Sequence, residues 1–118
     1  MQDNFSVEST TNTHSENLEV KYVYDVRRRV ARAFFPPKDA VRTRSAIANF
    51  EVDRNGKPAE FRFVRRSRDI AYDEAVRKAI NTNDFRPRQK PLVLKVEFKA
   101  GKVTVNALSI SYINKETE

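Results

Sequence analysis

Apolar residues recur at helical spacing in two stretches of the chain. The first stretch predicts a helix over 18–34, which ends before Pro36-Pro37 because a residue that precedes proline is disfavoured in a helix. The second predicts a helix over 67–81. In both, the apolar positions fall on a single face; they are Val23, Val26, Val30 and Phe34 in the first, and Tyr72, Ala75, Val76, Ala79 and Ile80 in the second.

Four other stretches alternate apolar and polar residues, as strands with one buried face do. Asn55-Gly56 separates the first two and favours a tight hairpin, because both residues tolerate positive φ. A break in the alternation at Val64 predicts either a β-bulge or the end of the strand near it, and a break near Asn106-Ala107 predicts a β-bulge there. The four predicted strands cover residues 41–53, 58–66, 92–99 and 103–112.

The order helix, strand, strand, helix, strand, strand predicts an α+β fold. We expect two helices packed on one face of a three- to four-stranded antiparallel sheet, in a domain over residues 18–113. The polar stretch 1–17 is interpreted as a disordered linker or a remnant, and 114–118 as a frayed tail. The predicted core consists of Val26, Val30, Phe50, Val52, Phe61, Val76, Ile80, Leu94, Val96 and Phe98.

The composition offers few side chains that could act in catalysis. The chain of 118 residues has no cysteine, which excludes thiol catalysis, disulfides and thiolate metal sites. Its single histidine, His14, lies in the polar leader, so no Ser/His nucleophile system can be drawn. Two glycines are too few for a dinucleotide-binding motif. We therefore expect no enzyme activity, cofactor, metal or small-molecule substrate.

Two carboxylate pairs remain as candidates for acid–base chemistry. Asp69 and Asp73 are four residues apart on one helix face, and Glu51 and Asp53 share one strand face. Helix capping accounts for the first pair and a solvated sheet face for the second. Neither pair is predicted to be catalytic.

The charge balance is basic, with 23 Lys and Arg against 16 Asp and Glu and a formal net charge of +7. Phe61 and Phe63 interleave with one basic block, as in sheets that stack single-stranded bases. Phe61 and Phe63 also lie on the same side of the predicted strand, as residues of a buried sheet face do. The chain begins with a helix, whereas an RNA-recognition sheet begins with a strand. Nucleic acid is therefore the less favoured partner, and solvated basic faces are the simpler interpretation.

Between Tyr24 and Lys99, several short pieces follow one another in a particular order and spacing. They are Phe34-Phe35-Pro36-Pro37 at a helix end, Phe50 to Gly56 in a hairpin, Phe63 to Ser67 on the return strand, Asp73 to Ile80 in a helix, Phe85-Arg86-Pro87, and a strand that ends in Phe98. In this order the chain resembles the C-terminal domain of the TonB/TolA group of periplasmic energy-transducing proteins.

The resemblance implies a non-enzymatic, periplasmic domain of the cell envelope. In that group, an inner-membrane anchor and a long linker carry the domain, and force derived from the proton gradient passes to an outer-membrane partner. The resemblance thus implies an outer-membrane or periplasmic protein partner and an inner-membrane motor complex, with a homodimer left open. The sequence shows no signal peptide pattern at its start and no apolar run near the ~20 residues of a membrane span.

The same group grips its partner by strand addition, at the edge of the strand that resembles Leu92–Lys99. Here residues 103–112 would fold back onto that edge, as a permanent strand or as a displaceable plug. We expect the binding edge on the outer strand, at Val103, Val105, Leu108, Ile110 and Tyr112. The alternative, if the outer strand is displaced, is Val93, Lys95, Glu97 and Lys99.

Two other functions remain open from the sequence. One is a basic nucleic-acid-binding module, whose affinity would fall steeply with salt. The other is a structural domain of an envelope secretion or conjugation assembly, which would use the same surfaces as an energy transducer.

Overall fold

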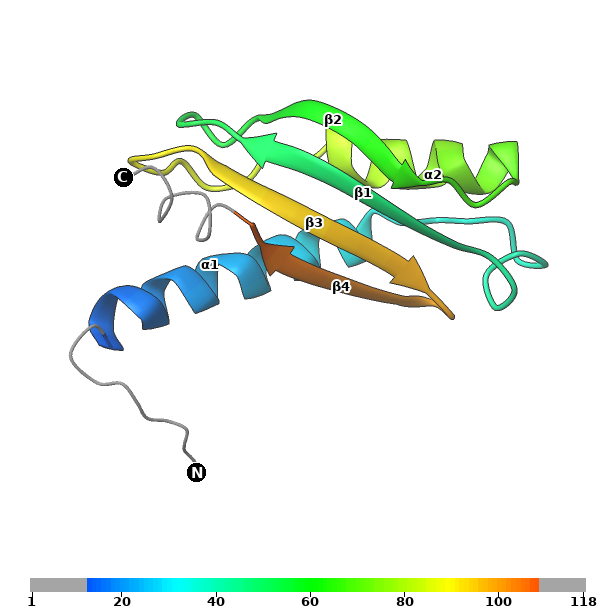
Figure 1. Ribbon diagram of the computed structural model, residues 1–118, viewed down its shortest axis with the longest axis horizontal. Helices are drawn as coiled ribbons and strands as arrows, with labels where there is room; N and C mark the ends of the chain where they lie inside the picture. The colour runs from blue at the N-terminus through cyan, green and yellow to red at the C-terminus, as the bar shows by residue number, and fades with distance from the viewer. Residues whose placement is uncertain (1–12, 109–118) are drawn as a thin grey trace.

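A computed structural model describes residues 13–108 of the chain as two helices against one face of a four-stranded antiparallel sheet (Figure 1). The strands lie in the order β2-β1-β3-β4. The predicted α+β fold and element order are confirmed. In chain order the elements are α1 (Thr13–Arg32), β1 (Ser45–Val52), β2 (Pro58–Arg65), α2 (Ile70–Asn81), β3 (Leu92–Lys99) and β4 (Lys102–Ala107).

The first helix begins at Thr13 rather than at Leu18. Extending a helix already held by the packing of Val26 and Val30 costs little per residue, so α1 continues into the polar sequence before it. Residues 1–12 and 109–118, with most of the leader and all of the predicted tail, lie outside the described residues. Neither described helix is long and apolar enough to cross a membrane.

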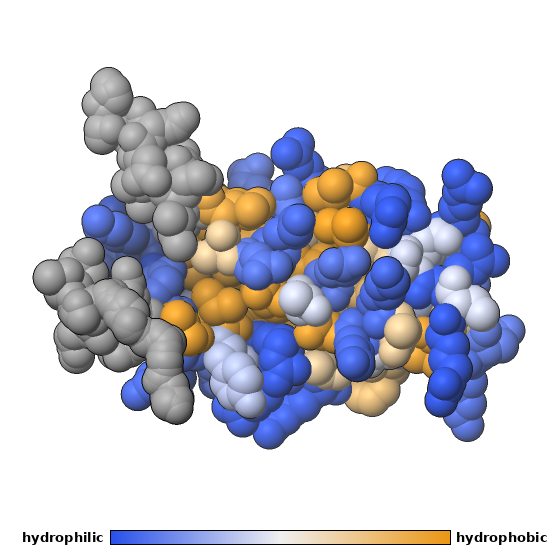
Figure 2. Space-filling model, turned by 60° about the horizontal axis from the view of Figure 1, so that its bottom comes forward, coloured by the Kyte–Doolittle hydropathy of each residue, from blue (hydrophilic) through white to orange (hydrophobic). Residues whose placement is uncertain are grey.

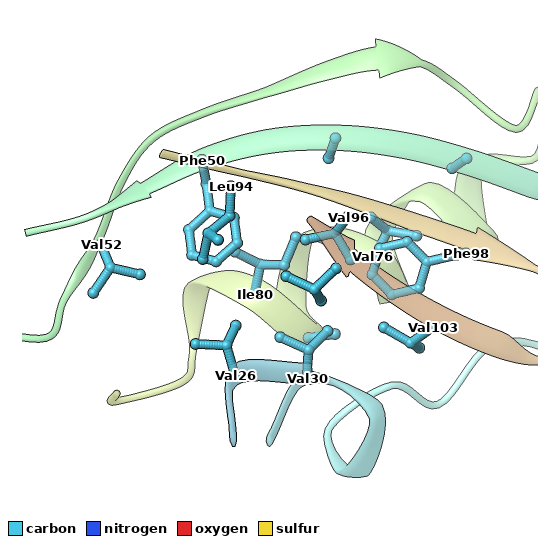
Figure 3. Close-up of a cluster of buried hydrophobic side chains, with 14 of the residues drawn as sticks. Val26, Val30, Phe50, Val52, Val76, Ile80, Leu94, Val96, Phe98 and Val103 are labelled. Atoms are coloured by element: carbon cyan, nitrogen blue, oxygen red, sulfur yellow. The ribbon is translucent and has the colours of Figure 1, made fainter. Parts of the chain in front are cut away.

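The core lies between the helices and the sheet (Figure 3). Every second residue of β1 and β3 is buried, so each of these strands presents one apolar face to the helices. Ala46 and Ala48 leave room in this layer for larger neighbours such as Phe98. All predicted core residues are buried except Phe61, which is half-buried and packs against the cluster.

The strand registers test the predicted bulges. Val64 is skipped in the pairing of β1 with β2, which confirms a bulge there. A second register shift lies between Asn49 and Glu51, opposite Glu60 and Phe61, and Glu60 has a φ of 52°. The bulge predicted near Asn106-Ala107 is wrong, because β4 pairs with β3 without a register shift through Ala107. The backbone N–H of Leu108 continues the ladder with a 2.8 Å bond to the carbonyl of Val93.

The chain before β1 is a turn instead of the predicted strand start. The carbonyl oxygen of Ala40 accepts the backbone N–H groups of Thr43 and Arg44, at 3.2 and 2.9 Å. Ala40 itself is buried in the core. The apolar residues at 40 and 41 therefore anchor a compact loop, and β1 begins only at Ser45.

Candidate partner-binding edge

The strand β4 forms one edge of the sheet. It pairs with β3 on one side, and no other strand within residues 13–108 lies on its outer side. Hydrogen-bonded and non-hydrogen-bonded pairs alternate along an antiparallel ladder, and Leu108 donates to β3. The backbone N–H and C=O groups of Val103, Val105 and Ala107 therefore face the outer edge.

Two side chains of the same strand, Val103 and Val105, point into the core, whereas Lys102, Thr104 and Asn106 are exposed. Val103 and Val105 are each only 8% exposed, and they belong to the main apolar cluster. These two residues of the predicted edge thus offer backbone groups to a partner, while their side chains anchor β4. Leu108 is half-buried at the end of the strand, and Ile110 and Tyr112 lie outside the described residues.

An apolar groove runs beside this edge, between β4 and α1. Its volume is about 350 Å³. Val20 and Tyr24 line it from the helix and remain 64% and 57% exposed. Figure 2 shows apolar surface on the side of the molecule that carries α1 and β4. The full lining is Glu19, Val20, Val23, Tyr24, Arg27, Val105, Asn106 and Ala107.

This groove was not predicted from the sequence. Val20 and Tyr24 are four residues apart and form a second apolar row beside the buried stripe of α1. That row was a usable signal, because a helix with a single buried stripe does not need it. The guanidinium of Arg27 lies 4.9 Å from the centre of the Tyr24 ring and covers one side of it.

The alternative binding strand, β3, is enclosed in the structure. It pairs along its whole length with β1 and, from Leu94 to Lys99, with β4. Its side chains Val93, Lys95 and Glu97 project from the sheet face opposite the core. A partner could pair with the edge of β3 only after β4 had been displaced.

Contacts around Asp25 and Arg29 hold the helical wall of the groove in place. Its carboxylate accepts hydrogen bonds from Arg29 Nε at 2.7 Å and Arg28 Nη2 at 3.0 Å. Partial burial raises the pKa of Asp25, but these two bonds outweigh it and hold the pKa below its ordinary value of 3.8. The same Arg29 donates to the carbonyl of Asp84 and accepts from Asn83 at its own carbonyl, which ties α1 to the connector before β3.

A second tie joins α1 to the same connector. The Tyr22 hydroxyl donates to the carbonyl oxygen of Arg86 at 2.8 Å, and Arg88 stacks over the Tyr22 ring at 4.7 Å. Arg88 also reaches Glu19 at 3.4 Å. Burial raises the pKa of Tyr22 to about 12, partly offset by Arg88, so the hydroxyl stays protonated and able to donate. The helix therefore forms a fixed wall beside the β4 edge.

Three of the four carboxylates considered for catalysis, all but Glu51, have structural partners. Asp69 caps α2 by accepting the backbone N–H of Tyr72 at 3.0 Å, and Asp73 accepts that of Ser67 at 2.9 Å. Asp53 accepts the N–H groups of Asn55 and Lys57 in the β1–β2 hairpin. Among the described residues, no three acidic or histidine side chains gather as a metal site would require.

The aromatic pair on β2 does not form an open stacking platform. Phe61 and Phe63 pack against the core, and Arg77 of α2 lies 5.4 and 5.5 Å from their ring centres. Arg66 covers Phe63 at 4.7 Å. Their faces are thus occupied by side chains of the protein, which removes the feature that suggested base stacking.

Comparison with known protein families gives one match, to the family described as TonB C terminal, over residues 19–100. The searches of curated proteins and of solved structures found no significant match. The matched residues include most of α1, both central strands β1 and β3, and the connector that holds α1 in place. Since the match covers well over half of the chain, this protein belongs to the TonB C-terminal family.

Proposed function

We propose that this domain is the partner-binding end of a TonB-like energy transducer and that it acts in the periplasm. Domains of this family are non-enzymatic parts of envelope energy-transducing systems. The partner in this proposal is an outer-membrane or periplasmic protein, and an inner-membrane motor complex supplies the force. The domain binds an extended segment of the partner, which adds a fifth strand beside β4.

The observation that carries this proposal is the outer edge of β4. The N–H and C=O groups of Val103, Val105 and Ala107 face outward at regular spacing, as an added strand requires. Backbone hydrogen bonds of this kind supply affinity with little demand on the partner sequence. The side chains of Val103 and Val105 stay in the core, so β4 is a firm template for pairing.

The groove beside β4 supplies sequence preference. A strand added at this edge would place alternate side chains over Val20, Val23 and Tyr24 of α1. Apolar side chains at those alternate positions would bury the exposed surface of the groove, and the intervening side chains would face solvent. The partner segment is therefore an alternating apolar–polar stretch about as long as the six residues of β4.

A titration with a synthetic peptide tests this proposal. The probe is an eight-residue peptide that alternates Val and Thr, added to the isotopically labelled full chain. We expect chemical-shift changes at Val103, Val105 and Ala107 and along the groove wall of α1, with slower amide hydrogen exchange at the first three. Chemical-shift changes confined to the Arg27–Arg32 face, with none in β4, would exclude strand addition at this edge.

A matched pair of proline variants separates the two edges of the sheet. Val105→Pro removes an outward N–H from β4 without removing a hydrogen bond to β3, so peptide binding should weaken at least tenfold. Val64→Pro changes the bulge residue on the opposite edge and should leave binding unchanged. Circular dichroism and thermal melting establish that both variants are folded. Equal binding by both folded variants would contradict the assignment of the edge.

A further inference from the structure

Half of the excess positive charge of residues 13–108 gathers at one end of the domain. This end, which we call the basic pole, comprises the loop 38–44, the segment 65–73 at the end of β2 and the start of α2, and the β3–β4 turn at 99–102. It is the end toward which the arrow of β3 points in Figure 1. Three acidic residues, Asp39, Asp69 and Asp73, oppose eight exposed cations: Lys38, Arg42, Arg44, Arg65, Arg66, Arg68, Lys99 and Lys102.

Contacts between distant parts of the chain hold the basic pole together. Arg44 Nη1 lies 3.4 Å from the carbonyl oxygen of Ser67, and Arg65 Nη2 lies 3.5 Å from the hydroxyl of Ser45. Ser45 pairs with Lys99 across the sheet, and Lys99 with Lys102. The three segments therefore present one continuous cationic surface.

The cations of the basic pole lack partners of opposite charge. None of the eight forms an ion pair with any residue between 13 and 108; the ion pairs of that range lie elsewhere. Two of the three local carboxylates are already engaged, because Asp69 and Asp73 accept backbone N–H groups at the start of α2. The basic pole thus keeps a strong positive potential toward solvent.

Large apolar side chains stand exposed beside these charges. Ile70, the first residue of α2, is 89% exposed, and Phe35 is 80% exposed. The ring of the preceding residue, Phe34, packs on Tyr72 of α2 and Phe98 of β3. Phe34 and Phe35 therefore lie between the start of α2 and the end of β3. Val64, which precedes Arg65, is also more than half exposed. Among residues 13–108, no packing contact accounts for the exposure of these side chains.

We propose that the basic pole docks on the surface of an anionic phospholipid bilayer. Clustered lysine and arginine residues are attracted to anionic headgroups, at about 1 kcal/mol for each residue near the surface. Exposed apolar side chains such as Ile70 and Phe35 insert at the boundary of the headgroups and acyl chains. This inference does not depend on strand addition, because no residue of the basic pole belongs to the outer edge at Val103, Val105 and Ala107 or lines the groove.

The combination of features favours a bilayer over an acidic protein or a nucleic acid. A nucleic-acid surface would pair the cations with a row of aromatic platforms for successive bases, but Phe61 and Phe63 are covered by arginine side chains, and the exposed ring of Phe35 is a single platform. An acidic protein segment would need a groove to define its path, whereas these cations radiate from three chain segments around one end of the molecule. A bilayer is a broad anionic surface with apolar material just beneath it, which matches both the charges and Ile70.

Vesicle co-sedimentation of the full chain tests this inference. We expect binding to phosphatidylcholine vesicles that contain about 30 mol% phosphatidylglycerol, none to pure phosphatidylcholine, and a steep loss as salt rises. The variant Arg65→Gln/Arg66→Gln/Arg68→Gln should bind about 100-fold more weakly, as three lost surface cations imply. A matched variant, Lys21→Gln/Arg54→Gln/Lys90→Gln, removes the same charge away from the basic pole and should lose much less. Equal losses would mean diffuse attraction and would overturn the proposal.

A fluorescence experiment locates the apolar contact. The chain has no tryptophan, so Ile70→Trp introduces a unique reporter at the basic pole. Its emission should shift to the blue on anionic vesicles and be quenched by brominated lipid, whereas the matched reporter Val20→Trp in the groove should not change. Unchanged emission of Ile70→Trp on anionic vesicles would contradict a bilayer partner. So would polyglutamate or single-stranded DNA that binds the chain as tightly as the vesicles do.

Discussion

At the scale of single residues, Gly56 shows how one position joins two distant segments. Its φ of +85° lies in the left-handed region, and its carbonyl accepts the N–H of Phe85 at 2.8 Å. A Cβ built at Gly56 would lie 2.1 Å from the carbonyl oxygen of Phe85. Both the hairpin and the connector that holds α1 therefore depend on the missing side chain.

We predict that Gly56→Ala destabilises the domain by more than about 2 kcal/mol, because it adds a backbone clash to the ~1–2 kcal/mol of a left-handed residue. Gly101→Ala is the matched control. Gly101 also has a positive φ of +78°, but its nearest neighbour would be Val41 Cγ2 at an ordinary 3.7 Å. Urea unfolding of both variants provides the measurement, and equal midpoints would show that the contact with Phe85 does not matter.

At the scale of elements, the attachment of α1 to the connector at 83–88 is electrostatic as well as apolar. Asp25 sits between Arg28, Arg29 and Arg86, and its side chain is only 13% exposed. Most other ion pairs of the described residues are far more exposed, as Lys57 with Asp84 illustrates, and such pairs contribute little. The position of α1, and with it the groove beside β4, should therefore respond to the charge of Asp25.

We predict that the Asp25 ion pairs stabilise the domain at neutral pH and are lost in acid. The folded pKa lies below the ordinary 3.8, so the contribution is complete above that value and disappears as pH falls through the lower folded pKa. Asp25→Asn should cost about 1 kcal/mol at pH 7. Urea midpoints measured from pH 7 to pH 2 should converge for the two proteins at the acid end.

The control for this prediction is Glu74→Gln. It breaks an exposed pair in which Arg77 Nε is 3.6 Å from the carboxylate, and it should change stability by less than about 0.5 kcal/mol. An Asp25 pKa at or above 3.8 in an NMR titration would show that the pairing does not hold in solution.

At the scale of the whole molecule, a single apolar layer between sheet and helices provides the stability. Phe98 illustrates this layer, because it is fully buried on β3 and its ring lies 4.6 Å from that of Phe34. Two regions of the outer surface differ in their chemistry. One is the apolar groove beside the edge of β4, and the other is the basic pole.

We predict that Phe98→Ala costs about 3–5 kcal/mol, a large part of the stability of a domain of this size. Phe35→Ala removes the same side chain from a site that is largely exposed and should cost less than about 0.5 kcal/mol. The two urea midpoints measure the contrast. An unchanged midpoint for Phe98→Ala would mean that the buried face of β3 is assigned wrongly.

Much of the fold followed from local patterns in the sequence. The stripe through Val26 and Val30, the alternation along β3 and the turn at Asn55-Gly56 were sufficient, because periodicity and turn chemistry act over a few residues. The start of β1 was placed too early for the same local reason, since apolar residues in a loop look like a strand until Ala40 is seen to anchor a turn. The bulge in β4 was predicted wrongly because a break in the apolar–polar alternation occurs both at a register shift and at the end of a strand.

By itself, the sequence determined the element order, the buried faces and the resemblance to the TonB/TolA group, because all of these depend on neighbouring residues. Only the tertiary structure decided that β4 is the outer strand, that Val20 and Tyr24 form a groove beside it, and that Asp25 holds α1 against the connector. It also brought Arg44, Arg65 and Lys102 to one end. Such features depend on which distant segments pair and pack, and the free energy of that packing is shared across the whole core.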